Sequence, residues 1–381
     1  MNQRVIKTVA LFSLAIGFFA AGCHSGSDTS GPIRIGQTVA LTGERTSIGE
    51  YLAAGAKMAV DEINAAGGIK GRKVELIQED SDDTNPAMIN AYKKVLTTKP
   101  VAILCNDVST QNLSIAPIAN QEKMPTFVGG TSPILLQGND WFFRFRPSDI
   151  LAAQAAAKFA VQTLGKKKVA IAHLTDDFGM AGRDFLTRYV KEFGGTVVID
   201  ESYNRLDRDF AGQLEKIRKS GAEVIINWAD TYTGATMMRQ NKQLSVNLPV
   251  IGSAAHGTPT TNKLAGEAAN GVYVVMDGVV TQVKDPKAED WVKRFKQRYN
   301  KEPEFNATAA YDAIFLIKQA IENASGATDN ESIKKGIFGI RGYAGIANTF
   351  TYGNNGEGPR QVVIAQIQEN HPIVKETVKT E

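Results

Sequence analysis

Two short clusters of small polar residues have the composition of a binding site for a small anion. The first is Asn106-Asp107-Val108-Ser109-Thr110 and the second is Gly129-Gly130-Thr131-Ser132, and each follows an apolar segment expected to be a strand. Hydroxyl groups and free backbone N–H groups at a helix N-terminus suit a carboxylate or another small anion. Ser and Thr also cap helices without any ligand, and from the residues alone the two interpretations are equally supported.

Other polar groups are less suited to chemistry. Carboxylates gather at Glu79-Asp80-Ser81-Asp82-Asp83 and at Asp176-Asp177, where helix caps and solvated turns are favoured over the alternative of a metal site. The four histidines are scattered along the chain: His24, His173, His256 and His371. Glycine-rich phosphate turns, a Gly-x-Ser-x-Gly elbow and a His-Glu-x-x-His zinc motif are missing from the sequence. We therefore expect a protein that is not an enzyme and that uses no cofactor and no metal.

One strand–helix–strand unit near the start of the chain predicts how such clusters are positioned. Ile33 to Leu41 is apolar and rich in β-branched residues, as in a buried strand, and a polar turn is expected at 42–49. Apolar residues then recur at helical spacing over 52–63, Gly67-Gly68 ends the helix, and 73–78 is a second strand. Such a unit is parallel and right-handed, so the loop after its first strand opens at the carboxyl edge of the sheet, where ligands bind.

The same alternation continues and predicts an α/β protein with parallel sheets. Further strands are expected at 101–104, 125–128, 169–174, 196–200, 224–227, 250–252, 272–276 and 362–368. Helices are expected at 85–98, 114–122, 151–164, 182–193, 210–220, 233–243, 289–300, 307–323 and 332–339. The chain of 381 residues is long enough for two domains.

The first 22 residues have the layout of a secretory signal peptide. Arg4 and Lys7 precede an apolar run from Val9 to Ala20 that is too short to span a membrane. Ala20-Ala21-Gly22-Cys23 resembles a bacterial lipobox, which implies that Cys23 is lipidated and begins the mature protein. Residues 23–31 are then a flexible tether, and we expect an extracytoplasmic location, periplasmic or on the cell surface, with a lipid anchor in the membrane.

Composition and cysteine content exclude several other classes of protein. Hydrophobic residues make up 43% and charged residues 22% of the chain, as in an ordinary globular protein. The net charge of +3 becomes +1 without Arg4 and Lys7, so no nucleic acid partner is expected. Cys105 follows an apolar strand and has no disulfide partner once Cys23 is lipidated, so a buried, inert thiol is predicted.

The chain resembles the leucine/isoleucine/valine-binding family of type I periplasmic solute-binding proteins. The resemblance covers nearly all of the mature chain, and its strength lies in the order of motifs that are individually unspecific. These motifs are 59–71 (AVDEINAAGGIKG), Phe145-Arg146-Pro147-Ser148-Asp149, Asp209-Phe210 before 221–224 (GAEV), 265–272 (AGEAANGV) and 310–313 (AYDA).

The resemblance implies two Rossmann-like α/β lobes with parallel sheets, joined by three hinge crossings. The crossings are expected near Pro147-Ser148, Met276-Asp277 and Phe350-Thr351. One lobe would contain 32–147 and 278–350, and the other 148–277 and 351–381. A ligand would lie in the cleft and the lobes would close on it, as periplasmic binding proteins do.

The family's ligand-carboxylate contacts fall on the two polar clusters. Gly129, with Gly130 beside it, and Thr131 match the backbone and hydroxyl pair of the family. The serine that assists them aligns with Asp107, and Ser109 and Thr110 follow two and three positions later. An ionised Asp107 would repel a carboxylate, so either Ser109 takes its place or the ligand differs.

The remaining family contacts fall on the second lobe. Phe178 matches the aromatic wall of the cleft. The acidic residue that binds an α-ammonium should follow Gly252-Ser253, where Ala254 stands instead. Asp230 is the candidate to supply that charge, with Tyr232 or Trp228 as a lid.

The expected function is that of a monomeric solute-binding lipoprotein that delivers a small molecule to the transmembrane permease subunits of an ABC importer. A branched-chain or related amino acid is the leading ligand. Urea, a short amide or an aromatic carboxylate is the alternative within the same fold. A ligand-sensing module is the alternative from another functional class, because a fold does not define a function.

Overall fold

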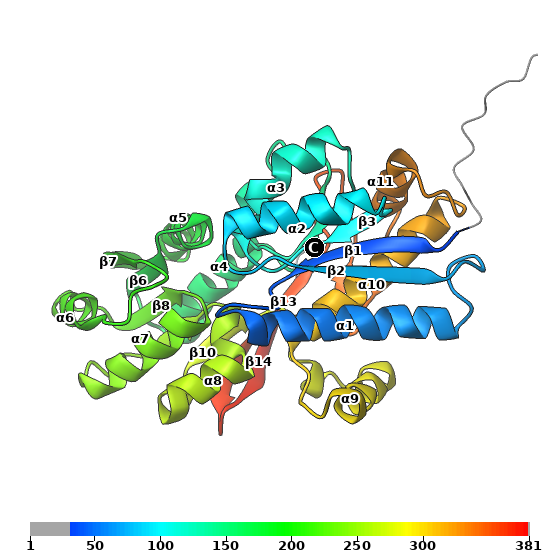
Figure 1. Cartoon of the computed structure of the whole chain (residues 1–381). Coiled ribbons are helices and arrows are strands. Elements are labelled where there is room, and N and C mark those ends of the chain that lie inside the picture. The colour runs from blue at the N-terminus through cyan, green and yellow to red at the C-terminus, as the bar shows by residue number, and fades with distance from the viewer. Residues whose placement is uncertain (1–30, 380–381) are drawn as a thin grey trace, which may run out of the picture.

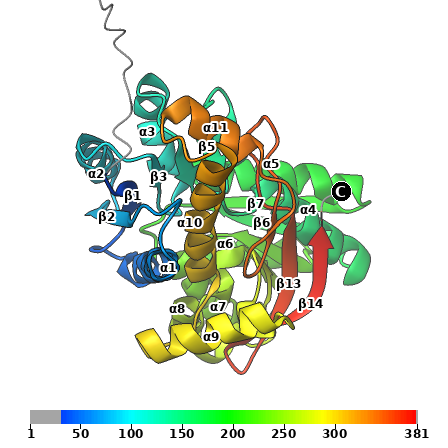
Figure 2. The same cartoon turned by 90° about the vertical axis from the view of Figure 1, so that its right-hand side faces the viewer.

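The computed structural model describes residues 31–379 and contains two large β-sheets, each packed against helices (Figures 1 and 2). The first sheet has five parallel strands in the order β2-β1-β3-β4-β5. The second has the order β14-β13-β10-β9-β8-β6-β7, in which β13 pairs antiparallel with both β10 and β14 and all other pairs are parallel. The predicted signal peptide, Cys23 and the tether up to residue 30 lie outside the described residues.

We call the five-stranded sheet with its helices lobe 1. Its elements are β1 (Ile33–Val39), α1 (Thr46–Ala65), β2 (Val74–Asp80), α2 (Asn85–Thr97), β3 (Ala102–Leu104), α3 (Ser109–Gln121), β4 (Thr126–Val128), β5 (Phe142–Arg144), α9 (Pro286–Tyr299), α10 (Phe305–Asn323) and α11 (Asn330–Phe338). The short strands β11 (Tyr343–Ala344) and β12 (Thr349–Phe350) pair with each other and pack on the same lobe.

We call the seven-stranded sheet with its helices lobe 2. Its elements are α4 (Asp149–Lys158), β6 (Lys168–Leu174), α5 (Asp177–Glu192), β7 (Thr196–Tyr203), α6 (Ala211–Lys219), β8 (Val224–Trp228), α7 (Thr231–Gln243), β9 (Val250–Gly252), α8 (Pro259–Ala265), β10 (Tyr273–Met276), β13 (Gln361–Gln368) and β14 (His371–Lys379). The predicted α/β fold with two lobes built on parallel strands is therefore confirmed.

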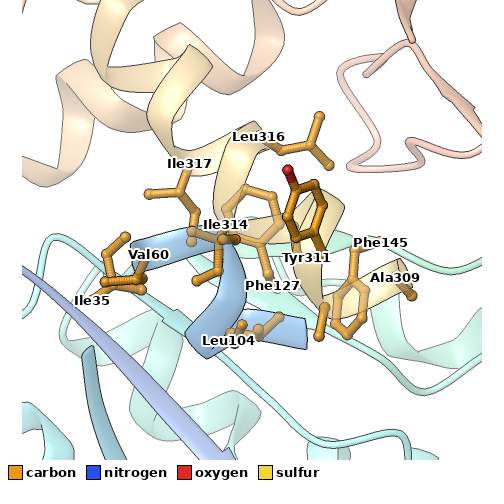
Figure 3. Close-up of a cluster of buried hydrophobic side chains, with 14 of the residues drawn as sticks. Ile35, Val60, Leu104, Phe127, Phe145, Ala309, Tyr311, Ile314, Leu316 and Ile317 are labelled. Carbon is orange, nitrogen blue, oxygen red and sulfur yellow. The ribbon is translucent and has the colours of Figure 1, made fainter. Parts of the chain in front are cut away.

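Both sheets are buried on both faces because successive residues of a strand enter different cores. In β3, Ala102 and Leu104 pack into the core beneath α1 and α10, whereas Ile103 packs into a core with α2 and α3. Figure 3 shows the first of these cores, in which Ile314 and Ile317 of α10 meet side chains from β1, α1 and the strands of the sheet. Helix α10 is buried along most of its length, so it forms part of the interior of lobe 1.

Three segments connect the lobes. Residues 145–148 join β5 to α4, residues 277–285 join β10 to α9, and residues 351–360 join β12 to β13. In Figure 1 the blue, cyan and orange elements of lobe 1 lie to one side of these connections and the green elements of lobe 2 to the other. The domain boundaries given above stay a prediction.

Several expected boundaries are wrong. The polar turn predicted at 42–49 is too long, because α1 begins at Thr46, and the helix predicted from residue 114 begins at Ser109. The helix predicted from residue 182 begins at Asp177. Strand β14 was not predicted, since it is an edge strand whose residues are only half-buried and give a weak apolar pattern.

Glycines near the starts of α1 and α5 are required by close packing of each helix on the preceding strand. A Cβ atom added to Gly49 would lie 1.7 Å from the Ala40 carbonyl oxygen, and one added to Gly179 would lie 2.1 Å from the Leu174 carbonyl oxygen. Only glycine lets these helices begin so close to the carboxyl ends of β1 and β6.

Gly49→Ala should therefore destabilise the protein by roughly 1–3 kcal/mol, because the new methyl group forces α1 away from β1. Gly212→Ala in α6 is the matched control, since nothing lies within 4 Å of its added Cβ. The control should be neutral or stabilising by up to about 1 kcal/mol. Chemical denaturation of the two variants measures the difference, and equal stabilities would contradict the close-packing explanation.

Candidate functional site

A cavity lies between the two lobes and is lined by both of them and by the connecting segments. It encloses about 740 Å³ of atom-free space, including solvent at its opening. Six residues of the set predicted from the sequence line it: Asp107, Ser109, Thr131, Phe178, Asp230 and Ala254.

The other three predicted residues do not line the cavity. The N–H of Gly129 donates to the Asn106 carbonyl oxygen (3.2 Å), and the N–H of Gly130 donates to Asn112 Oδ1 (3.0 Å). Thr110 lies in the first turn of α3. In this structure the two glycine N–H groups therefore hold the loop after β4 in place, and a ligand would have to compete with those bonds.

The loop at 129–132 is also held through its carbonyl groups. Arg144 of β5 donates to the carbonyl oxygens of Gly130 (2.5 Å) and Ser132 (2.9 Å), and Arg146 donates to that of Gly129 (3.3 Å). Both arginines are buried. The two arginines therefore fix Thr131 in the cavity wall. Ser109 lines the same wall, and its hydroxyl oxygen accepts from the Ser132 N–H (3.2 Å).

Asp149 is a cavity residue that the sequence interpretation treated only as a possible helix cap. Ser148 is the cap of α4, and Asp149 is buried beside Thr131, whose carbonyl oxygen accepts the Asp149 N–H (2.9 Å). Burial raises the pKa of Asp149 to about 7, although a hydrogen bond from Thr131 and the charges of Arg144 and Arg146 act in the opposite direction. Its Oδ2 atom has no hydrogen-bond partner among residues 31–379.

Lobe 2 supplies an aromatic wall. Phe178, at the start of α5, stacks on Trp228, at the end of β8, with ring centroids 6.1 Å apart and an angle of 26° between the ring planes. Gly182 permits this arrangement, because a Cβ there would meet the indole ring of Trp228 at 2.2 Å. The small side chain of Ala254, in the turn after β9, also lines the cavity. This wall suits an apolar group of a ligand.

The two aspartates that the sequence analysis placed in the ligand site, Asp107 and Asp230, are both paired with arginine. Asp107 accepts from Arg45 Nη2 (2.5 Å), and Asp230 accepts from Arg205 Nη1 (2.6 Å). Arg205 also pairs with Asp176. Asp176 and Asp230 are the N-caps of α5 and α7, so one guanidinium group joins the helix N-termini that face the cavity.

Asp230 has little capacity left for a ligand. Its Oδ1 accepts from both the N–H (3.0 Å) and the hydroxyl (2.7 Å) of Thr233, and its Oδ2 accepts from Arg205. Burial would raise the pKa of Asp230, but Arg205 and the Thr233 bonds outweigh burial and keep this pKa below its usual value. Asp230 is thus an ionised and well-bonded carboxylate.

Arg146 joins two of the connecting segments at the base of the cavity. It forms a two-pronged ion pair with Asp277, at 2.6 and 3.2 Å, and its guanidinium lies 4.8 Å from the ring centre of Phe305. Because both ionic partners are largely buried, this contact fixes the geometry of the connections beside the cavity.

The lobes touch at the opening of the cavity. The Tyr232 hydroxyl of lobe 2 donates to the Glu44 carbonyl oxygen of lobe 1 (2.8 Å), and Arg208 lies 3.3 Å from the Glu44 carboxylate. The Ser132 hydroxyl donates to the Asp177 carbonyl oxygen (3.2 Å). These contacts join the two lobes, and Tyr232 reaches the β1–α1 loop without lining the cavity, so its role as a lid stays a prediction.

The remaining candidates from the sequence have structural roles. His173 is buried and contacts the Leu174 carbonyl oxygen (2.7 Å) and Asp200 (3.1 Å). Cys105 is buried, and burial raises the pKa of its thiol to about 12. Within residues 31–379 there is no group of three or more His, Cys, Asp or Glu side chains arranged to hold a metal ion.

Arg45, Asp149 and Arg205 are the cavity residues that the sequence interpretation missed. Arg205 lies two residues after β7, so the rule that selected residues after strand ends could have selected it, whereas Arg45 lies six residues after β1, immediately before α1. Phe305 lines the cavity from the start of α10, and no local signal marks it.

The fold and the cavity together define a two-lobed protein that encloses a small molecule. A family model described as "Periplasmic binding protein" matches residues 32–372, so the chain belongs to the periplasmic binding protein family. The family is named for binding and not for catalysis. Among the described residues, none of the helices combines the length and the apolar character that a membrane crossing requires.

Several similar proteins are named for the binding of branched-chain amino acids. The Leu/Ile/Val-binding protein homolog 3 of Brucella melitensis is 27% identical, over 94% of this chain and 95% of the relative. The leucine binding protein LivK of Thermotoga maritima superposes with a TM-score of 0.85 at 24% identity, covering 91% of this chain and 99% of that one. LivJ of Streptococcus pneumoniae, solved in complex with isoleucine, gives a TM-score of 0.84 at 22% identity, covering 92% and 100%.

The double pairing of Arg205 leads to a prediction about stability. Arg205→Gln should lower the free energy of unfolding by about 1–3 kcal/mol at pH 7, because it leaves the buried carboxylate of Asp230 without its charged partner. Since the pKa of Asp230 is lowered in the folded protein, this contribution exists above the unfolded pKa near 4 and disappears as the pH falls through the folded pKa. The gap between variant and wild type should therefore shrink in acid.

Arg188→Gln is the matched control for this experiment, because Arg188 lies on the exposed side of α5, 4.0 Å from Glu192. It should change the stability by less than about 0.5 kcal/mol. Denaturant unfolding at pH 7 and pH 3.5 measures both variants. Equal losses in the two variants would show that Arg205 does not hold the helix N-termini together.

Proposed function

We propose that this protein binds one amino acid, of the branched-chain or a related apolar type, in the cavity between its lobes and delivers it to an ABC importer. The observation that carries the proposal is the division of the cavity wall. Lobe 1 contributes the hydroxyl groups of Ser109 and Thr131, whereas lobe 2 contributes the aromatic pair Phe178 and Trp228. A molecule with a polar end and an apolar end fits this division.

The charges of the cavity favour a ligand without net charge. Each arginine that lines it is already paired with a carboxylate: Arg45 with Asp107, Arg146 with Asp277 and Arg205 with Asp230. A simple aromatic carboxylate would bring an unpaired negative charge into this balanced site, whereas a zwitterionic amino acid brings none. The names of the Leu/Ile/Val-binding relatives support the same ligand class, whereas two structures of the same fold from Rhodopseudomonas palustris were solved with 3,4-dihydroxy benzoic acid and with benzoate.

Asp149 is the proposed acceptor for the ligand's ammonium group. It lies next to Thr131 and has an unpartnered buried oxygen, whereas both oxygens of Asp230 are engaged and Ala254 has no polar side chain. The family resemblance implies an acidic residue for the ammonium group at position 254, with Asp230 as the substitute. We assign this role to Asp149.

The transport context rests on the family and on the start of the sequence. Delivery to permease subunits follows from the role of such proteins in ABC importers. The signal peptide and the lipidated Cys23 would keep the protein, as a monomer, at the outer side of the membrane from which the permease takes up its solute.

A thermal-shift screen tests the proposal most economically, because a ligand that binds only the folded protein raises its melting temperature. The panel contains L-leucine, L-isoleucine, L-valine, L-alanine, urea, acetamide and benzoate. The proposal expects stabilisation by the branched-chain amino acids. Stabilisation by urea, acetamide or benzoate alone would replace it with one of the alternative ligand classes.

Two substitutions on opposite lobes should weaken the binding of the best amino acid from this screen. Thr131→Ala removes a hydrogen bond to the polar end, which should lower the affinity roughly tenfold to a hundredfold. Phe178→Ala removes part of the aromatic wall and should act mainly through a faster dissociation rate. Calorimetry and stopped-flow fluorescence measure the two effects, with Thr187→Ala on the exposed side of α5 as control. Wild-type affinity in both variants would place the ligand elsewhere.

The raised pKa of Asp149 leads to a dependence of affinity on pH. Below its pKa of about 7 the carboxyl group of the free protein is mostly protonated, and it must lose its proton to bind an ammonium group. The affinity for L-leucine should therefore fall by up to about tenfold per pH unit between pH 7 and pH 5 and stay level above pH 8.

Asp149→Asn should bind L-leucine more weakly at pH 8 and show little change with pH. Asp230→Asn is the contrasting variant, and it should retain the wild-type pH dependence. Calorimetry at pH 5.5, 7 and 8 tests both variants. An affinity of the wild type that is the same at all three values would rule out Asp149 as the ammonium acceptor.

A further inference from the structure

Arg45 differs from the other cavity arginines in having an uncommitted hydrogen-bond donor. Its Nη2 atom is bound to Asp107, but its Nε atom is buried and has no hydrogen-bond partner among the described residues. Only 13% of the Arg45 side chain is exposed, and 12% of that of Asp107. A buried N–H donor of a charged group without a partner is unfavourable, and the residue lines the ligand cavity.

The loop that carries Arg45 is held firmly in place. Asp80 accepts from the Leu41 N–H (2.9 Å) and from the Thr42 hydroxyl (2.5 Å), and Asp83 accepts from the Glu44 N–H (2.5 Å). Asp80 at the end of β2 and Asp83 after it thus bind the β1–α1 loop. Arg45 is the last residue before α1, so these hydrogen bonds fix the backbone from which its side chain extends.

A second donor lies on the same wall. Ser109 Oγ accepts from the Ser132 N–H, which leaves its own O–H to donate. Arg45 and Ser109 together present two donors from lobe 1 to the cavity. An anionic oxygen pair can accept both.

From these observations we infer that Arg45 binds the ligand's carboxylate group and that Asp107 is a positioning residue, which holds the guanidinium in place without touching the ligand. This inference rests on the proposed amino acid ligand and deepens it. It also explains how an aspartate can occupy a position where the resemblance expects a hydroxyl group. The ion pair cancels the repulsion that Asp107 alone would exert, and the Nε–H group of Arg45 remains available to the carboxylate.

The test compares amino acids with their α-amides, which keep the ammonium group and the side chain but lack the carboxylate charge. Calorimetry on the full chain, with the acid and amide forms of L-leucine, L-isoleucine and L-valine as probes, gives an acid-to-amide affinity ratio. The wild type should prefer the acid by about tenfold or more. Arg45→Gln should lose most of this preference by weakening the acid and not the amide.

Asp107→Asn distinguishes a positioning role from direct ligand contact. The amide oxygen of this variant can still accept from Arg45 Nη2 and position the guanidinium, while the positive charge of Arg45 is no longer compensated, so the affinity for the acid should be unchanged or higher. Arg34→Gln is the control, because Arg34 pairs with Glu75 at the surface and lies outside the cavity. Melting temperatures of the ligand-free variants show whether each one is folded, and Arg45→Lys should retain part of the preference if Arg45→Gln fails to fold.

The outcomes separate this inference from the proposed function. If the wild type binds none of the three acids, the amino acid function is wrong and the inference fails with it. If the wild type binds an acid and Arg45→Gln keeps the same acid-to-amide ratio, the inference is overturned while the function stands. A loss in Asp107→Asn equal to that in Arg45→Gln would also overturn it, because the pair would then act only as a structural unit.

Discussion

The cavity depends on the compensation of the carboxylates that the two sheets direct toward it. Helices whose N-termini face the cavity are capped by Asp176 and Asp230, and Asp107 precedes the first turn of α3. Uncompensated, these charges would repel each other as the lobes close. Arg45 in lobe 1 and Arg205 in lobe 2 compensate these charges by forming ion pairs with the carboxylates. This pairing permits the contact between the lobes, and the proposal of a zwitterionic solute rests on it.

Each lobe uses the same local design to bring a side chain to the cavity. A strand ends, a short loop follows, and a helix begins so close to the strand that only glycine fits at Gly49 and Gly179. The residue before each glycine, Ile48 in lobe 1 and Phe178 in lobe 2, lines the cavity. The lobes therefore contribute apolar surface from equivalent positions, and both also contribute hydroxyl groups, Ser109 and Thr131 in lobe 1 and Thr231, Ser253 and Thr258 in lobe 2.

Much of the fold and part of the candidate site could be predicted from the sequence, because strands that are buried on both faces appear as short apolar runs. The strand–helix alternation and the position of Thr131 and Ser109 after strand ends followed from that pattern, whereas Phe178 was implied by the family resemblance. Contacts between residues far apart in the chain could not be predicted. The partners of Asp107 and Asp230 lie 62 and 25 residues away, and nothing local indicates that Arg45 or Arg205 would reach them. Strand β14 was missed because an edge strand needs little apolar character.

The central claim is that the two lobes close on one small solute held between them. Small-angle X-ray scattering of the wild-type protein, with and without a saturating amino acid chosen by calorimetry, tests it most directly. Only the closed arrangement contacts the ligand from both lobes, so binding should shift the population toward it and reduce the radius of gyration. A radius of gyration that is the same without ligand and at full saturation, with no change in the scattering profile, would contradict closure on the ligand.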